Sequence, residues 1–345
     1  METSGRPGAP PEAGRLGVAH LRRLWAQAMR RRQGLPVESD PKSGAVNDAV
    51  VFDGLGLVIE ETLRYLYQEG PDYEAFEGWV VERSGGLDPQ RIDRINAVTE
   101  GREYGEETKR WLRQIDEMEP VLDSRDLDFF GENGYVVVPE AVTKDACRAA
   151  ELAIWEFLGK DPDDPDTWYV GTRSIFVPLY HHPALWTNRK SLRVHKAFSQ
   201  VWGTSDLWPI VDRVSMNPPE REGFRFPGPR LHWDVTLVPP LGFGVQGLLY
   251  LTDTASHQGA FTCVPGFHKR VDAWLSSLPP EADPREQDLL SLGTVPVAGS
   301  AGDLIIYHQG LPHGGSPNRA SLPRVVQFLD YLPPRRPAAS WTSWR

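Results

Sequence analysis

Apolar residues recur at helical spacing in the first part of the chain. Between Leu16 and Arg32, the residues Val18, Leu21 and Trp25 follow one another at intervals of three and four, with arginines mostly between them. This spacing predicts a basic amphipathic helix. We favour the interpretation that it docks on the acidic remainder of the chain, and an organelle-targeting peptide is the alternative.

The stretch from 47 to 120 is also predicted to be helical. Apolar spacing is clearest in 51–67, 73–81 and 92–98, with breaks at the Gly-Pro pair 70–71 and the Gly-Gly pair 85–86. The stretch contains no histidine and no recognisable catalytic motif. We therefore expect it to serve in packing, or in contact with a second copy of the chain or with a carrier protein.

The pattern changes to short β-type runs after about residue 123. A helix that ends at Gly134, a strand at 135–138 and a helix that begins after Thr143 come first. Short alternating or apolar runs separated by Gly and Pro then predict strands at 211–216, 231–238, 246–252, 260–264, 304–307 and 324–332. Short strands at such spacing indicate a β-sandwich or barrel.

These patterns divide the chain into four predicted parts. They are a disordered tail at 1–14, an N-terminal helical region at 15–120, a mainly β domain with flanking helices at 121–335, and a C-terminal tail at 336–345.

Composition and charge exclude several classes of protein. The 345 residues are 40% hydrophobic and 24% charged, which is typical of soluble globular chains, and no run approaches the roughly 18 apolar residues of a membrane helix. We therefore expect a cytoplasmic protein that is not held in a membrane. The net charge of -10 argues against nucleic acid as a partner. Only Cys147 and Cys263 are present, so any metal site must use His and carboxylate ligands.

The sharpest local motif is His232-Trp233-Asp234, within a run that reads as a strand. Side chains alternate along a strand, so His232 and Asp234 would share one face while Trp233 points away. Two metal ligands would then come from one element. The motif is short, and two polar residues on a solvated strand are the alternative interpretation.

A third ligand is available at His313, 81 positions after His232. Two imidazoles and one carboxylate on one side of an iron leave positions open for an α-keto acid and O₂, as in non-haem Fe(II) oxygenases. Zinc accepts the same three ligands in hydrolytic sites, so these residues alone leave the metal open.

An arginine follows at the start of the last predicted strand. Arg324 lies 11 positions after His313, and its planar guanidinium matches a carboxylate with two parallel hydrogen bonds. The carboxylate of a cosubstrate would neutralise it inside a barrel, and an internal Asp or Glu is the alternative partner. Arg319 is nearer to His313, but it lies in a polar loop where a solvated charge is expected.

The order and spacing of these motifs resemble the phytanoyl-CoA dioxygenase family of Fe(II)/2-oxoglutarate oxygenases. The resemblance covers about 123–334 and rests on the segment from Phe130 to Pro139, His232-x-Asp234, the segment from Gly259 to Lys269, and the stretch from Ala301 through His313 to Arg324. It implies a double-stranded β-helix, which is a jelly-roll of the cupin type, in addition to the N-terminal helical region.

The resemblance also implies cofactors and site residues. Fe(II) would be held by His232, Asp234 and His313, and Arg324 would bind the distal carboxylate of 2-oxoglutarate, with O₂ as the oxidant. Further positions follow by approximate spacing only: Tyr250, Ser215 and Arg173 would lie near 2-oxoglutarate. Their alternative roles are core packing, strand-edge hydrogen bonding and a surface charge, respectively. Family members often carry a hydroxyl residue two positions after the distal histidine, where this chain has Gly315.

The resulting expectation is an Fe(II)- and 2-oxoglutarate-dependent dioxygenase that oxidises a C–H bond of a small organic molecule and releases succinate and CO₂. Related halogenases replace the carboxylate ligand with a small residue, so Asp234 favours hydroxylation, while desaturation, ring closure and epimerisation remain open. The alternative is a cupin-like zinc hydrolase or isomerase, or a binding protein without catalysis. No cluster of basic residues suited to the phosphates of coenzyme A occurs in 123–334.

Overall fold

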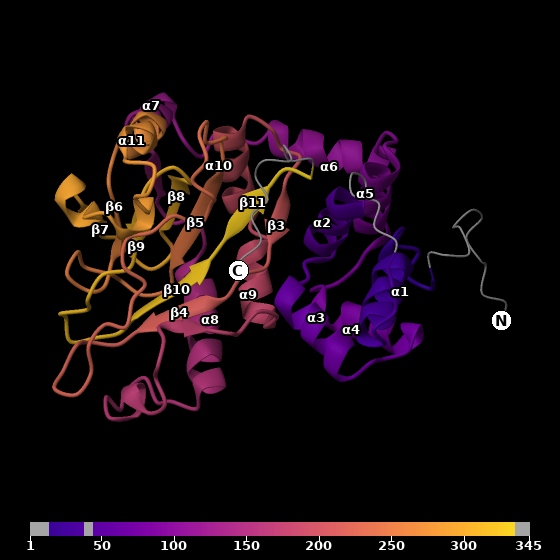
Figure 1. The fold of residues 1–345 in the computed structure, drawn as a ribbon, viewed down its shortest axis with the longest axis horizontal. Coiled ribbons are helices and arrows are strands. Elements are labelled where there is room, and N and C mark those ends of the chain that lie inside the picture. Colours follow the sequence, from indigo (N-terminus) through magenta and orange to yellow (C-terminus); the bar gives the residue numbers. More distant parts are fainter. Residues whose placement is uncertain (1–13, 38–43, 335–345) are drawn as a thin grey trace. The chain divides into compact units, whose positions relative to one another are not determined.

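The computed structural model describes residues 14–37 and 44–334, which form two compact units (Figure 1). The first unit contains the described residues up to Glu117, Asp206–Val211 and the described residues from Leu332 onward, and the second contains Met118–Ser205 and Asp212–Tyr331. Asp206–Val211 thus joins the helical unit, although it lies inside the stretch predicted as the β domain. The predicted tails at 1–14 and 336–345 lie outside the described residues, except for Gly14.

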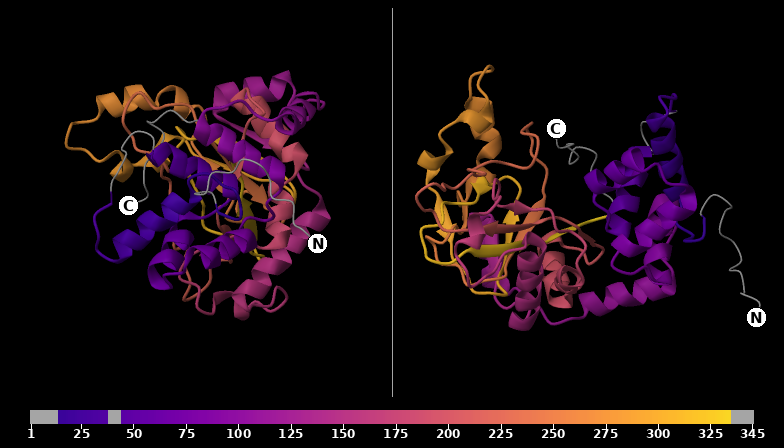
Figure 2. Two further views of the ribbon diagram at one scale, coloured as in Figure 1. Left: turned by 90° about the vertical axis from the view of Figure 1, so that its right-hand side faces the viewer. Right: turned by 90° about the horizontal axis from the view of Figure 1, so that it is seen from below.

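The first unit is helical, as predicted. Its helices are α1 (Leu21–Arg32), α2 (Gly44–Leu55), α3 (Ile59–Gln68), α4 (Tyr73–Arg83), α5 (Pro89–Glu100) and α6 (Glu106–Asp116), and two further views show them grouped together (Figure 2). Side-chain caps begin two of them: Asp72 accepts a hydrogen bond from the N–H of Ala75, and Asp88 accepts one from Arg91. Their apolar faces meet in a common core around Leu55, Phe76 and Ile95.

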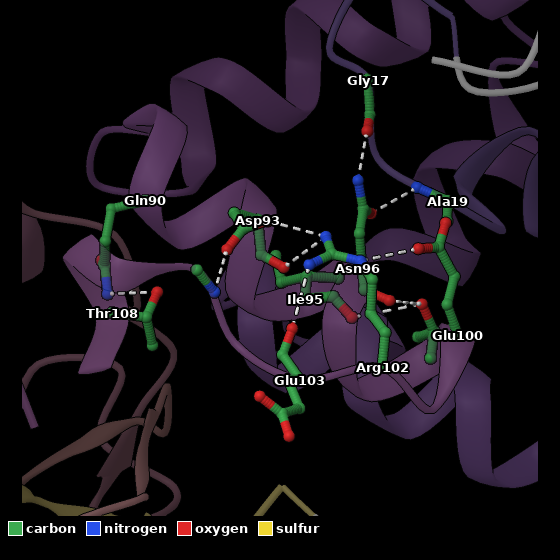
Figure 3. A network of polar contacts seen from close by, with 12 residues as sticks. Gly17, Ala19, Gln90, Asp93, Ile95, Asn96, Glu100, Arg102, Glu103 and Thr108 are labelled. Carbon is green, nitrogen blue, oxygen red and sulfur yellow. Dashed lines mark hydrogen bonds and ion pairs between the residues drawn. The ribbon is translucent and has the colours of Figure 1, made fainter. Parts of the chain in front are cut away.

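Helix α1 begins later than the apolar spacing predicts, at Leu21 instead of Leu16. The preceding residues are held in turns by side chains of other helices. Asn96 of α5 accepts a hydrogen bond from the Ala19 N–H at 2.8 Å and donates one to the Gly17 carbonyl at 2.7 Å (Figure 3). Their backbone groups are therefore paired outside a helix.

The charged end of α5 is also held by side chains. Arg102 donates to Asp93 at 2.7 Å and to Glu100 at 3.0 Å, and Asp93 accepts the N–H of Gly105 just before α6 (Figure 3). These contacts fix the turn between α5 and α6.

The second unit mixes helices with antiparallel sheets. Its helices are α7 (Ser124–Asn133), α8 (Lys144–Leu158), α9 (Pro183–Arg189), α10 (Leu192–Trp202) and α11 (Val271–Ser277), with short 3-10 turns η2 (Thr167–Tyr169), η3 (Phe267–Lys269), η4 (Pro284–Glu286) and η5 (Leu289–Leu292). A capping box at Asp123 begins α7, and Gly134 ends it with φ of 77°. Thr143 caps α8, as predicted.

Two sheets carry most of the strands. The larger has the order β1-β8-β5-β10-β4-β2, where β1 is Tyr135–Val138, β2 Phe176–Val177, β4 Val214–Asn217, β5 Val245–Tyr250, β8 Leu304–His308 and β10 Arg324–Phe328. The smaller has the order β7-β6-β9, where β6 is Phe261–Cys263, β7 Val295–Val297 and β9 His313–Gly314. All pairings within these two sheets are antiparallel. Strands β3 (Trp208–Ile210) and β11 (Asp330–Leu332) lie outside both sheets.

The strand predicted at 231–238 is wrong in extent. Only His232 pairs with a neighbour, through an isolated antiparallel bridge to His313 at β9. The carbonyl of Val235 accepts a hydrogen bond from the Arg285 side chain at 2.7 Å instead of from a strand. A side chain therefore satisfies the backbone that the alternating pattern assigns to a sheet.

No helix in the described stretches 14–37 and 44–334 has the length and apolar character needed to span a bilayer.

Candidate active site

Three predicted ligands come together in the second unit. A nitrogen or oxygen atom from each of His232, Asp234 and His313 lies within 4.8 Å of the others. The Nε2 atom of His232 is 3.3 Å from Asp234 Oδ1, and the Nε2 atom of His313 is 3.1 Å from Asp234 Oδ2. No other such group of His, Cys, Asp or Glu side chains occurs in the part of the chain that the structure describes.

The backbone holds the two histidines side by side. The N–H of His232 donates to the His313 carbonyl at 2.8 Å, and the N–H of His313 donates back at 2.9 Å. This reciprocal pair joins segments that are 81 positions apart in the sequence. The relative position of the two imidazoles therefore depends on rigid main-chain contacts.

The outer ring nitrogens orient both imidazoles. Nδ1 of His232 lies 2.8 Å from the Arg230 carbonyl, and Nδ1 of His313 lies 3.1 Å from the Leu311 carbonyl. A carbonyl only accepts hydrogen bonds, so Nδ1 carries the proton in each ring and Nε2 is left to face Asp234. This is the tautomer that a metal ion needs at Nε2.

The carboxylate between the imidazoles is held in its ionised form. Burial raises the pKa of Asp234, but hydrogen bonds from Nε2 of His232 and His313, which form when no metal is bound and the rings are protonated, outweigh burial, so the pKa lies well below its usual value. Gln246 adds a hydrogen bond from Nε2 to Asp234 Oδ2 at 2.8 Å. Two imidazoles and an ionised carboxylate form a donor set that fits Fe(II) and also fits zinc.

A cavity of about 230 Å³ opens beside the three ligands. Aromatic side chains form much of its wall, and polar groups lie at both ends. The lining residues are Ile175, Phe176, Asp212, Arg213, Pro229, His232, Asp234, Gln246, Leu248, Phe261, Tyr307, His313, Gly314, Gly315, Arg324, Phe328 and Asp330.

Arg324 brings a buried positive charge to this cavity. Its side chain is 2% exposed, and its Nη2 atom donates one long hydrogen bond, 3.4 Å, to the Ser215 hydroxyl. Its Nε atom has no hydrogen-bond partner among the described residues, and no carboxylate there pairs with it. Burial lowers the pKa of Arg324 to about 10, so the group stays charged at neutral pH. A carboxylate entering the cavity would supply the missing partner.

The other predicted cosubstrate contacts differ in position. Ser215 is fully buried and accepts a hydrogen bond from Arg324, but it is not among the residues that line the cavity. Tyr250 is fully buried, but its hydroxyl donates to the Val297 carbonyl at 2.6 Å and accepts from the Phe261 N–H at 3.0 Å. Tyr250 therefore joins β5 to β6 and β7 and does not line the cavity.

Two arginines lie away from the three ligands. Arg173 is exposed and lines a separate hollow with Lys160, which adjoins the cavity at Phe176. Arg319 is exposed, in agreement with the solvated charge predicted for its loop. The structure thus brings only Arg324 of these arginines to the cavity.

The residue two positions after His313 is a glycine, so the cavity wall has no hydroxyl at this point. Gly315 lines the cavity, and a Cβ atom there would lie 3.1 Å from the Phe226 ring. The next hydroxyl, Ser316, donates to the Ala260 carbonyl at 3.1 Å. The hydroxyl that family members often place near this point is therefore absent from the cavity wall.

Five polar or charged residues that line the cavity were not predicted as site residues: Gln246, Tyr307, Asp330, Asp212 and Arg213. The position of Gln246 could have been predicted. It lies two residues before Leu248 in the predicted strand, so both side chains take the same face of the sheet, and both line the cavity. Tyr307 lies within an apolar run, where its hydroxyl gives no separate signal. Asp330 follows the predicted strand core, and its position depends on how the strand ends.

Part of the sequence is similar to one family of known proteins. Residues 130–326 match the sequence profile described as phytanoyl-CoA dioxygenase (PhyH). A Dictyostelium discoideum protein assigned as a phytanoyl-CoA dioxygenase is 20% identical over 259 residues, which are 60% of this chain and 74% of that protein.

Solved structures of low similarity were also found. The non-heme alpha ketoglutarate dependent carbocyclase SnoK from nogalamycin biosynthesis has 19% identity and a TM-score of 0.45, with 63% of this chain and 87% of that chain covered. AviO1 from Streptomyces viridochromogenes has 19% identity and a TM-score of 0.45, with 64% and 100% covered. EctD from S. alaskensis with bound Fe has 19% identity and a TM-score of 0.45, with 62% and 78% covered.

Proposed function

Because the chain belongs to the phytanoyl-CoA dioxygenase family, we propose that it hydroxylates a C–H bond of a small organic molecule. The family is one of Fe(II)- and 2-oxoglutarate-dependent oxygenases, and its cofactors are Fe(II), 2-oxoglutarate and O₂. The observation that carries the proposal for this chain is the buried guanidinium of Arg324, which has no carboxylate partner within the described residues and lines the same cavity as the three ligands.

The chain order of the strands supports a double-stranded β-helix as the core. After β4 in the larger sheet, the chain passes to His232 beside the smaller sheet, returns to β5, and crosses to β6 and β7. It then alternates again through β8, β9 and β10. Repeated alternation between two facing antiparallel sheets is the topology of a jelly-roll.

Several residues in and beside the cavity have a defined task in this proposal. His232, Asp234 and His313 would hold Fe(II), and Arg324 with the Ser215 hydroxyl would hold the distal carboxylate of 2-oxoglutarate. When bound, iron and 2-oxoglutarate supply oxidation by O₂, with release of succinate and CO₂. The aromatic walls of Phe176, Phe261 and Phe328 would exclude water and position the substrate carbon.

Asp234 supports hydroxylation over halide transfer, because the carboxylate fills the position that a halide would need. A zinc hydrolase would use the same three ligands but has no use for a buried arginine at the opposite end of the cavity. The two functions therefore predict different behaviour towards 2-oxoglutarate.

The test is anaerobic binding of Fe(II) and 2-oxoglutarate, followed by admission of O₂. We expect a visible charge-transfer band when both are present, and conversion of 2-oxoglutarate to succinate that requires iron. Zinc in place of iron should abolish succinate formation. Absence of both the band and succinate, with metal still bound, would contradict the proposal and favour the zinc hydrolase.

A further inference from the structure

The inward face of the larger sheet is arranged in layers of side chains across neighbouring strands. Alternate residues of a strand face the same side, so successive layers lie about 6–7 Å apart. One layer contains Val326, Ser215 and Tyr250, because Val326 of β10 pairs with the other two across β4 and β5. The next layer contains Phe328 and Leu248, which pair across β10 and β5.

A polar layer follows these apolar side chains. Gln246 of β5 pairs with Tyr307 of β8, one layer beyond Leu248. Asp330 follows Phe328 by two positions, and its carboxylate accepts the Gly247 N–H at 2.7 Å. All three line the cavity, and we call Gln246, Tyr307 and Asp330 the outer polar layer. It lies at the opposite end of the inward face from Arg324.

Tyr307 has a hydroxyl that the protein itself does not use. The side chain is 3% exposed, and its ring centroid lies 4.6 Å from the rings of both Phe261 and His313. The hydroxyl has no hydrogen-bond partner in the stretches 14–37 and 44–334, whereas the buried hydroxyls of Tyr250 and Tyr331 both donate to backbone carbonyls. Buried polar atoms are normally hydrogen-bonded, and Gln246 beside this phenol has a buried Oε1 atom with no partner among the described residues, so the two cavity-lining side chains together indicate a ligand.

The hydroxyl of Tyr307 is a neutral phenol. A tyrosine side chain has an ordinary pKa of about 10 and needs no special surroundings to be protonated at neutral pH. The phenol can therefore both donate and accept a hydrogen bond at neutral pH.

Gln246 ties the outer polar layer to the metal ligands. Its Nε2 atom donates to Asp234 Oδ2 at 2.8 Å, and its neighbour in the layer, Tyr307, packs against His313. A group held by this layer would thus lie next to the metal centre, where the oxidised carbon must be. The layer is therefore in position to orient a substrate and not only to close the cavity.

The charges at this end are predominantly acidic. Asp212 and Asp330 line the cavity together with Arg213, whose guanidinium is 3.2 Å from Asp212 and 5.3 Å from the centre of the Phe176 ring. Asp212 and Asp330 thus place carboxylate acceptors beside the cavity for hydroxyl and amino groups of a substrate, and they disfavour an anionic group there.

We propose that the outer polar layer binds the substrate through hydroxyl or amino groups, and that the substrate is a neutral or cationic small molecule with an apolar ring. The ring would lie against the aromatic wall formed by Phe176 and Phe328, whose ring centroids are 5.8 Å apart. This inference rests on the proposed function, because the cosubstrate is assigned to the Arg324 end.

The experiment uses the full chain loaded with Zn(II) and 2-oxoglutarate, so that no turnover occurs. Three probes of matched size are compared by ligand-observed NMR: 2-phenylethanol, 2-phenylethylamine and phenylacetate. We expect the alcohol and the amine to bind, and phenylacetate to bind at least about tenfold more weakly.

The Tyr307→Phe variant keeps the ring contacts and removes only the hydroxyl. It should weaken the binding of the alcohol and of the amine by about three- to tenfold and leave the thermal unfolding temperature unchanged. Tyr135→Phe is the matched control, because Tyr135 pairs with Tyr307 across β1 and β8 but does not line the cavity; it should leave all three affinities unchanged. Asp330→Asn should weaken binding of the amine more than binding of the alcohol, because it removes a carboxylate that lines the cavity.

Two outcomes would overturn the inference: phenylacetate binding as tightly as the alcohol in the unmodified chain, or an unchanged affinity for the alcohol and the amine in Tyr307→Phe. Failure of the chain to retain 2-oxoglutarate with metal is a separate result that contradicts the proposed function. The two failures are therefore distinguishable.

Discussion

Two buried arginines, one in each unit, show how the same side chain can serve structure or ligand binding. Arg94 in the helical unit is 3% exposed and donates to Asp206 at 3.0 Å and to the Leu207 carbonyl at 2.9 Å, with its guanidinium 3.8 Å from the centre of the Trp208 ring. Arg324 in the second unit is 2% exposed but has only one long hydrogen bond.

The difference lies in how completely each charge is compensated. A buried charge costs several kcal/mol unless it is paired and hydrogen-bonded. Arg94 meets that cost within the protein, and its partners join Asp206–Val211 to the helical unit. Arg324 does not, so its free energy depends on what enters the cavity. Fully paired burial indicates a structural arginine, and unpaired burial beside a cavity indicates a binding arginine.

The largest effect on activity should come from changing one of the three predicted metal ligands. Asp234→Ala should abolish 2-oxoglutarate turnover and weaken iron binding, because two imidazoles alone hold Fe(II) poorly. Asp128→Ala, on the exposed face of α7, is a control. Succinate formation and iron titration measure the effect. Full activity in Asp234→Ala without added carboxylate would remove this residue from the site.

Loss of Arg94, the paired arginine, should lower the stability of the fold and leave the binding of 2-oxoglutarate unchanged. Arg94→Ala should lower the free energy of unfolding by about 3 kcal/mol, the lower end of the range for breaking a buried pair, because Asp206 is 26% exposed. Chemical denaturation measures this change. The affinity of the folded variant for 2-oxoglutarate should be unchanged, and a selective loss of that affinity would contradict the comparison.

Changing Arg324, the unpaired arginine, should weaken the binding of 2-oxoglutarate and leave the stability of the ligand-free protein unchanged. Arg324→Lys should weaken 2-oxoglutarate binding by about ten- to a hundredfold, since an ammonium cannot form two parallel hydrogen bonds and a charge-assisted bond contributes roughly 1.5–3 kcal/mol. Titration of the metal-loaded protein measures the affinity. Arg324→Met should abolish binding without lowering the stability of the ligand-free protein; a large loss of stability would show that Arg324 is structural.

The smallest effect should come from the neighbouring hydroxyl. Ser215→Ala removes a 3.4 Å hydrogen bond from Arg324. It should weaken the binding of 2-oxoglutarate by a few fold, which corresponds to about 0.5–1 kcal/mol. The same titration applies. A loss as large as that of Arg324→Lys would mean that the Ser215 hydroxyl contributes as much to cosubstrate binding as the guanidinium, contrary to this expectation.

Local patterns predicted the elements better than their ends. The period of apolar residues correctly predicted the helices of the first unit, and Gly134 and Thr143 correctly marked helix boundaries. The start of α1 and the strand at 231–238 were predicted wrongly. In both places a side chain distant in sequence, Asn96 or Arg285, satisfies the backbone instead of a regular element. The packing role, oligomer contact and carrier contact expected of the N-terminal region remain predictions.

The sequence by itself determined which residues can bind a metal and a carboxylate. With two cysteines, a metal site had to draw on His and carboxylate groups, and the order His232, Asp234, His313, Arg324 is legible because each type of side chain has distinctive chemistry. Their tasks are tested by the variants above.

Only the tertiary structure decided which of these groups already have partners. The sequence does not distinguish Arg94 from Arg324, or Tyr250 from Tyr307, because whether a buried polar atom is satisfied depends on the register of neighbouring strands and on residues far along the chain. Alternation tells which face a side chain takes, but not what lies opposite. Compensation of charge and hydrogen bonds is a property of the assembled core, and it separates structural groups from those left for a ligand.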